Sequence, residues 1–140
     1  MRYLGLDLGT RTLGLSISDK TGTIASTYDT LRFEEKDYDS VLDKLKEIIK
    51  KEEVSKIVLG LPKNMNNSMG FRALETIEFK EKLENYLNME VILVDERLTT
   101  IQANNYMLDA DLSRKKRKEK KDTLAANIIL QSYLDRMKRR

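Results

Sequence analysis

A single carboxylate inside an apolar amino-terminal run is the feature that most constrains the fold of this chain. Asp7 lies within residues 3–10 (YLGLDLGT), which have the composition of a buried β-strand. An ionised carboxylate left unpaired inside a sheet costs several kcal/mol or more, so protonation, a cationic partner or a metal ion must compensate it. The fold must therefore bring a compensating group to the strand that carries Asp7.

The length of 140 residues suits one domain of ordinary size, since domains typically run to about 100–150 residues. We therefore expect residues 1–140 to form a single domain. Every apolar stretch is well short of the ~20 residues that span a bilayer, and the amino terminus has strand pattern without a signal-peptide profile. These features predict a cytoplasmic protein without a membrane partner.

The chain contains no cysteine and no histidine, which limits the chemistry open to it. Disulfides, thiolate nucleophiles, cysteine zinc sites and imidazole bases are all excluded. Carboxylates, hydroxyls, lysines, backbone groups or a bound ion must perform any reaction. Hard oxygen ligands suit magnesium or manganese (Mg2+ or Mn2+) better than zinc or copper.

Positive charge is concentrated in one segment, although the net charge is only +3. Residues 114–121 hold seven basic side chains and one acidic one, and the basic members are Arg114, Lys115, Lys116, Arg117, Lys118, Lys120 and Lys121. Such clustering is typical of a polyanion-binding surface, where phosphate contacts give affinity without sequence preference. A solvated loop whose charges aid solubility explains the run equally well at this point.

Hydrophobic patterning predicts a mixed sheet of the α/β class. Three closely spaced strands, at residues 2–8, 13–18 and 23–31, should form an antiparallel meander. Short continuous apolar runs at 57–61 and 91–94 indicate buried parallel strands. Pro62, the only proline, should end the first of these runs.

Helical spacing of apolar residues predicts four helices, over residues 34–53, 71–87, 99–110 and 122–137. They should cover both faces of the sheet. The last helix would begin at Asp122, directly after the basic segment.

Three carboxylates fall at comparable places in this arrangement. Asp7 lies on the first strand, Glu96 directly follows a buried strand, and Asp122 would open the last helix. Ligands of α/β sheets gather near strand ends. Three acidic groups brought together need a divalent cation, and two cations ~3.5–4 Å apart can stabilise the attacking and leaving oxygens of a phosphodiester. This is nuclease chemistry that needs no histidine.

Four motifs occur along the chain, at residues 7–11 (DLGTR) with Gly14, 60–62 (GLP), 95–100 (DERLTT) and 122–126 (DTLAA). Together they resemble the YqgF (RuvX) family of Holliday junction resolvases and pre-16S rRNA nucleases. The resemblance covers essentially the whole chain and implies a ribonuclease H-like fold. It also implies a role in maturing the 5′ end of pre-16S rRNA or, by analogy, in resolving branched DNA. The family's acidic triad falls on Asp7, Glu96 and Asp122.

The sequence departs from the family in the loop after residue 62. Asparagines occupy positions within residues 64–70 where the family usually has an acidic residue and a glycine. Asn67 tolerates positive φ better than most residues, so the backbone shape of the loop can survive this change.

Each candidate residue also has a structural interpretation. Asp7 could form an ion pair, Glu96 could be a surface residue with Asp95 competing for its role, and Asp122 could be a helix N-cap. Arg11 and Arg97 could be ordinary surface charges. The order of all four motifs along the chain favours the functional interpretation.

The first hypothesis is a metal-dependent endonuclease in which Asp7, Glu96 and Asp122 hold one or two Mg2+ or Mn2+ ions and water attacks the phosphodiester in line. Arg11, Arg97 and the basic residues of 114–121 would bind the phosphate backbone. The partners would be pre-rRNA or branched DNA, with ribosomal particles as a further candidate, and the chain would act as a monomer or a homodimer.

Two other classes of protein remain as alternatives. A non-catalytic RNA-binding module for ribosome assembly would bind RNA without cutting it. The residues 7–10 (DLGT) also resemble the first phosphate loop of actin-like ATPases and sugar kinases, but those proteins need a second lobe to enclose a nucleotide. ATP binding would distinguish this third class.

Overall fold

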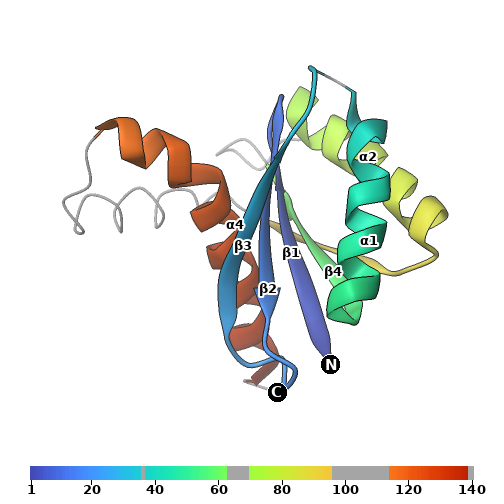
Figure 1. Cartoon of the computed structure of the whole chain (residues 1–140), viewed down its shortest axis with the longest axis vertical. Coiled ribbons are helices and arrows are strands. Elements are labelled where there is room, and N and C mark those ends of the chain that lie inside the picture. Colours follow the sequence, from blue (N-terminus) through green and yellow to red (C-terminus); the bar gives the residue numbers. More distant parts are fainter. Residues whose placement is uncertain (36, 63–69, 96–113, 139–140) are drawn as a thin grey trace.

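The computed structural model describes residues 1–35, 37–62, 70–95 and 114–138, and Figure 1 shows a β-sheet with helices on both faces. The sheet has five strands in the order β3-β2-β1-β4-β5. The strands are β1 (Arg2–Leu8), β2 (Thr12–Ser18), β3 (Ala25–Arg32), β4 (Val54–Leu61) and β5 (Val91–Asp95). The predicted helix 99–110 and the loop residues 63–69 lie outside the described residues.

The strand directions confirm the predicted mixed sheet. β1, β2 and β3 pair antiparallel in sequence order, whereas β4 pairs parallel with β1 and β5 pairs parallel with β4. β1 is the central strand, and both of its faces are covered by helices. Its continuous apolar character follows from this double burial.

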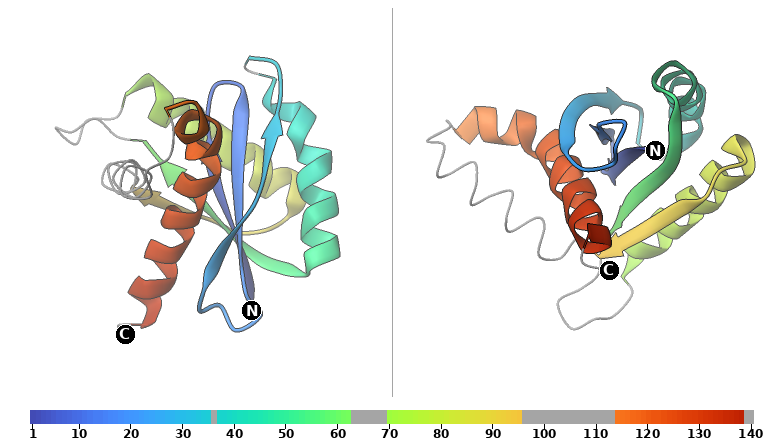
Figure 2. Two further views of the ribbon diagram at one scale, coloured as in Figure 1. Left: turned by 60° about the vertical axis from the view of Figure 1, so that its left-hand side comes forward. Right: turned by 90° about the horizontal axis from the view of Figure 1, so that it is seen from below.

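The two faces of β1 belong to two different parts of the core. Leu4, Leu6 and Leu8 point to a cluster that includes Leu45 and Phe79. These last two residues come from α1 (Leu42–Glu52) and α2 (Phe71–Leu87). The neighbouring positions of β1 face the opposite side, which α4 (Arg114–Lys138) covers, as Figures 1 and 2 show.

The first helix begins later than the predicted residue 34. A short 3-10 turn, η1 (Tyr38–Val41), precedes α1, which begins at Leu42. Phe33 explains this delay, because its backbone N–H donates to the carbonyl of Arg11 at 2.9 Å and its ring packs against Tyr38, with 5.5 Å between the ring centroids. The chain is therefore held beside the strands before it can turn into a helix. α2 has the predicted bounds.

The last helix is longer than predicted, and this corrects the interpretation of Asp122. α4 begins at Arg114, so the basic segment 114–121 is helical and Asp122 lies inside the helix rather than at its N-cap. The segment lacks glycine and proline, and lysine, arginine and glutamate are good helix formers. None of the helices in the described ranges has the length and apolar character needed to cross a bilayer.

Candidate active site

Asp7 lies on the side of β1 that α4 covers, close to the carboxyl end of the strand. It pairs with Gly14 of β2, and its side chain is half-buried. Strand side chains alternate between faces, so Asp7 shares its face with Gly5 and Tyr3. Tyr3 packs against Tyr133 of α4, with 5.8 Å between ring centroids. Asp7 is therefore the acidic member of the row of β1 residues that faces α4.

Small residues bring α4 unusually close to the sheet. A Cβ atom added to Gly5 would lie 2.8 Å from the Cβ of Leu130 and would also clash with the Ser16 hydroxyl. Ser16 is fully buried and donates a hydrogen bond of 2.7 Å to the backbone carbonyl of Ala126. This contact joins β2 directly to the backbone of α4. The position of α4 along β1 is fixed at Gly5 as a result.

The contacts also define the direction in which α4 runs. Tyr3, near the start of β1, donates a hydrogen bond to the sulfur of Met137 at 3.7 Å, near the end of α4. Ala126 and Leu130 lie beside Gly5 instead. α4 therefore runs antiparallel to β1, and its earlier residues lie toward the carboxyl end of the strand.

This geometry brings the backbone of residue 122 toward Asp7. Residue 122 precedes Ala126 by one helical turn, a rise of ~6 Å, and Asp7 follows Gly5 by two strand positions, or ~6.6 Å. Both steps lead in the same direction from the contact at Gly5. Two of the three predicted acidic positions thus approach the same end of the sheet.

The third predicted acidic residue follows β5, whose carboxyl end lies at this same edge. Leu6 of β1 is in register with Leu59 of β4, and Leu59 is in register with Leu93 of β5. β5 ends at Asp95. Glu96 comes next in the sequence, but Glu96 and Arg97 lie outside the described residues.

The described part of the chain contains no group of three histidine, cysteine, aspartate or glutamate side chains that could hold a metal ion. Only one side chain of the predicted triad, that of Asp7, is described there. The donors at the predicted positions are all carboxylates, and the whole chain lacks histidine and cysteine. This donor chemistry fits a hard divalent cation such as Mg2+ or Mn2+.

Of the predicted phosphate-binding residues, the structure describes Arg11 and the helical backbone of residues 114–121. Arg11, in the turn after β1, is exposed and lies 3.7 Å from the carboxylate of Glu35, which is also exposed. Exposed pairs of this kind contribute little, so a phosphate can compete for the guanidinium. Residues 114–121 form the first turns of α4, which stand clear of the sheet in Figures 1 and 2.

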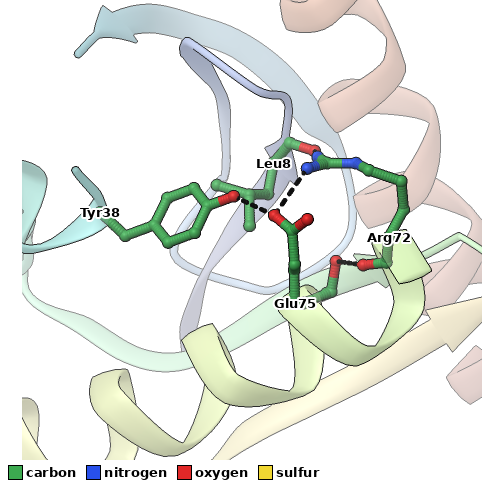
Figure 3. A network of polar contacts seen from close by, with 5 residues as sticks. Leu8, Tyr38, Arg72 and Glu75 are labelled. Carbon is green, nitrogen blue, oxygen red and sulfur yellow. Dashed lines mark hydrogen bonds and ion pairs between the residues drawn. The ribbon is translucent and has the colours of Figure 1, made fainter. Parts of the chain in front are cut away.

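A network of residues outside the predicted site lies on the opposite side of the same strand end (Figure 3). Arg72 donates to the carbonyl of Leu8 at 2.9 Å and to the carboxylate of Glu75 at 3.1 Å. Tyr38 donates to the same oxygen of Glu75. Burial, and then the hydrogen bond to Glu75, raise the pKa of the Tyr38 hydroxyl, which favours its protonated, donating form.

One sequence signal could have pointed to this network. Arg72 occupies the first turn of α2, where the helix dipole disfavours a positive charge. A cation at such a position is expected to have a partner outside the helix.

The sheet and its helices define a ribonuclease H-like fold, which known structures share. Thermus thermophilus RuvC in complex with a Holliday junction substrate has a TM-score of 0.59 at 12% identity, covering 98% of this chain and 96% of that chain. The fowlpox virus Holliday junction resolvase has a TM-score of 0.57 at 14% identity, covering 97% and 99%. At such low identity these likenesses show the fold alone.

Sequence similarity identifies the family within this fold. The model of the RuvX family of Holliday junction resolvases matches residues 1–136, and the chain belongs to this family. A Staphylococcus aureus protein named "Putative pre-16S rRNA nuclease" is 50% identical over 135 residues, which cover 96% of this chain and 95% of the relative. The predictions of the family, of the fold class and of a nuclease are confirmed.

Proposed function

We propose that this chain is a metal-dependent endonuclease that matures the 5′ end of pre-16S rRNA, with Asp7, Glu96 and Asp122 as its acidic site. The observation that carries the proposal is the antiparallel packing of α4 on β1, which supports a position of residue 122 near Asp7. Glu96 follows β5, whose carboxyl end lies at the same edge. The whole of residues 1–140 is proposed to act as a single domain.

A divalent metal ion would be held by these three carboxylates. Mg2+ or Mn2+ fits the all-oxygen donor set, and when bound it would supply electrostatic stabilisation of the phosphate and of the departing oxygen. The part of the protein is to hold three negative charges at one edge of the sheet. Such a cluster is unfavourable without a cation, so the site should bind one in the absence of substrate.

The remaining contacts would go to the nucleic-acid backbone. Arg11 and Arg97, with the basic residues of 114–121, would bind phosphates on both sides of the acidic site. The basic residues of 114–121 would act from the first turns of α4, which begins at Arg114. Affinity should depend strongly on salt, and base sequence should be read weakly.

The relative with 50% identity supports pre-16S rRNA as the substrate. The family description and the solved complex of RuvC with a Holliday junction support branched DNA as the second candidate. We propose a cytoplasmic protein, acting as a monomer or a homodimer, and ribosomal particles as a further partner.

The test is cleavage of labelled pre-16S rRNA and of a four-way DNA junction, side by side, with Mg2+ or Mn2+. Asp7→Asn should abolish cutting while nucleic-acid binding is retained, because it removes a metal-binding charge and preserves shape. Asp29→Asn is the matched control, since Asp29 is an exposed strand carboxylate on β3. Cutting by Asp7→Asn at the wild-type rate would contradict the proposal. Binding of RNA without any cutting by the wild type would favour the non-catalytic RNA-binding module.

A further inference from the structure

The end of β1 beyond Asp7 is held by a side chain of α2. β1 pairs with β4 only as far as Leu6↔Leu59, whereas the strand continues to Leu8. Arg72 of α2 donates to the carbonyl of Leu8 at 2.9 Å (Figure 3). A side chain therefore binds the strand beyond its last pair with β4.

The peptide group between Leu8 and Gly9 is held at both of its polar atoms. Arg72 binds its carbonyl oxygen, and its N–H donates to the carbonyl of Thr12 at 2.7 Å. A planar peptide group with both ends bonded cannot rotate without breaking a hydrogen bond. This peptide group begins at Leu8, the residue after Asp7. Its fixed orientation therefore restricts the backbone conformation at Asp7 and the direction of the Asp7 side chain.

The guanidinium of Arg72 is itself held in place. Glu75 accepts from it at 3.1 Å and also accepts the hydroxyl hydrogen bond of Tyr38. The side chain of Glu75 is only 12% exposed, and Tyr38 is buried. Charge-assisted bonds to a largely buried carboxylate fix the guanidinium fork in one orientation. Through Tyr38, η1 is hydrogen-bonded to the carboxylate that holds Arg72.

We propose that Arg72 is a positioning residue for the metal site: held by Glu75 and Tyr38, it fixes the carboxyl end of β1 and so the placement of Asp7. This inference deepens the proposed function and rests on it. Arg72 acts from the face of the sheet opposite to α4, so it shapes the site through the strand backbone.

The first readout is metal affinity without nucleic acid, measured by calorimetry with Mn2+. Arg72→Ala should weaken Mn2+ binding by about tenfold, which is the low end of the effect of removing groups that orient metal ligands. Arg72→Lys should fall between wild type and Arg72→Ala, because an ammonium group keeps the charge but lacks the fork that reaches two acceptors. Tyr38→Phe should have the smallest effect.

The second readout is amide hydrogen exchange at Gly9, whose N–H belongs to the peptide group that Arg72 holds. Exchange should accelerate in Arg72→Ala and recover partly in Arg72→Lys. In the cleavage assay, Arg72→Ala should need about tenfold more Mn2+ for half-maximal kcat, with the KM for nucleic acid unchanged.

Arg2→Ala is the matched control, because Arg2 makes a similar pair of contacts at the other end of β1. Its guanidinium donates to the carbonyl of Glu52 at 3.1 Å and lies 3.9 Å from the Glu52 carboxylate. Arg2→Ala should lower the Tm while leaving Mn2+ affinity and Gly9 exchange as in wild type.

Wild-type Mn2+ affinity and Gly9 exchange in Arg72→Ala would overturn the inference, as would an equal loss of affinity in Arg2→Ala. A wild-type protein that binds Mn2+ but cuts neither substrate would contradict the proposed function alone, since affinity and exchange still test Arg72. A wild-type protein that binds no Mn2+ would overturn both.

Discussion

Small residues decide where the larger functional groups of this protein lie. Gly5 and Ser16 leave room for the backbone of α4 beside β1 and β2, and Ser16 bonds the carbonyl of Ala126. Asp7 follows Gly5 by two strand positions, and residue 122 precedes Ala126 by one helical turn. Adding one methyl group at Gly5 should therefore change both the packing of α4 and the rate of cleavage at the proposed site.

Gly5→Ala tests this dependence. The new Cβ would meet the Cβ of Leu130 at 2.8 Å, and α4 must shift because that atom belongs to the stem of the side chain. We expect a loss of about 1–3 kcal/mol in the free energy of unfolding, as for other overpacked cores. Cleavage should fall by about 10- to 100-fold because the acidic groups are misplaced.

Urea unfolding and the cleavage assay provide the two measurements. Thr27→Ala, at an exposed position of β3, is the control and should change the free energy of unfolding by less than about 0.5 kcal/mol. Wild-type stability and activity in Gly5→Ala would show that α4 adapts without moving the site.

At the scale of elements, α4 joins a basic segment and an apolar segment, which the sequence pattern had assigned to a charged run and a separate helix. Its second half packs on the sheet through Ala126, Ile129 and Leu130, which are fully buried. Its first half carries the basic residues. Figures 1 and 2 show that the first turns of α4 bend away from the half that packs on the sheet.

The turn between β2 and β3 contains a carboxylate whose contribution to stability should depend on pH. The Thr21 hydroxyl and the backbone N–H groups of Thr23 and Ile24 donate to the Asp19 carboxylate, and they lower its pKa from 3.8 to about 2. A lowered pKa in the folded state means that these bonds stabilise the fold fully above about pH 4. That stabilisation is lost as the pH falls toward 2.

Asp19→Asn should therefore lower the Tm by a constant amount above about pH 5, and the difference from wild type should shrink between pH 4 and pH 2. Thermal unfolding across this pH range measures it. A difference that stays constant down to pH 2 would show that the charge of Asp19 does not contribute.

At the scale of the whole molecule, positive charge is divided between two faces of the sheet. Residues 114–121 begin α4 on one face, while Lys50 and Lys51 lie in the last turn of α1, which covers the other. Only the first group belongs to the proposed phosphate-binding surface. Nucleic-acid binding should therefore depend on which lysines are removed rather than on net charge.

The double variant Lys120→Ala/Lys121→Ala should weaken RNA binding and reduce its salt dependence. Removing one lysine–phosphate interaction lowers the slope of log K against log salt by about 0.7–0.9. Lys50→Ala/Lys51→Ala carries the same change in net charge and should bind as wild type does. Titrations at several salt concentrations measure both variants, and equal slopes for the two would contradict a directed surface.

The strands and α2 could be predicted from the sequence because their signals are local. The apolar runs of β1, β4 and β5 and the periodicity of α2 are read over a few residues. The start of α4 was predicted wrongly because a charged run has no hydrophobic period, although its helix propensity is high. The N-cap interpretation of Asp122 failed for the same reason.

By itself, the sequence determined the family, the mixed sheet and the identity of the candidate acidic residues. Only the tertiary structure decided how α4 lies on β1 and which side chains hold the end of that strand. Gly5 contacts Leu130, and Arg72 contacts Leu8. Each pair is far apart in the chain, so no local pattern encodes it. Such contacts depend on the shapes of helices and strands that have already formed, because close packing and hydrogen-bond geometry are set only when these elements meet.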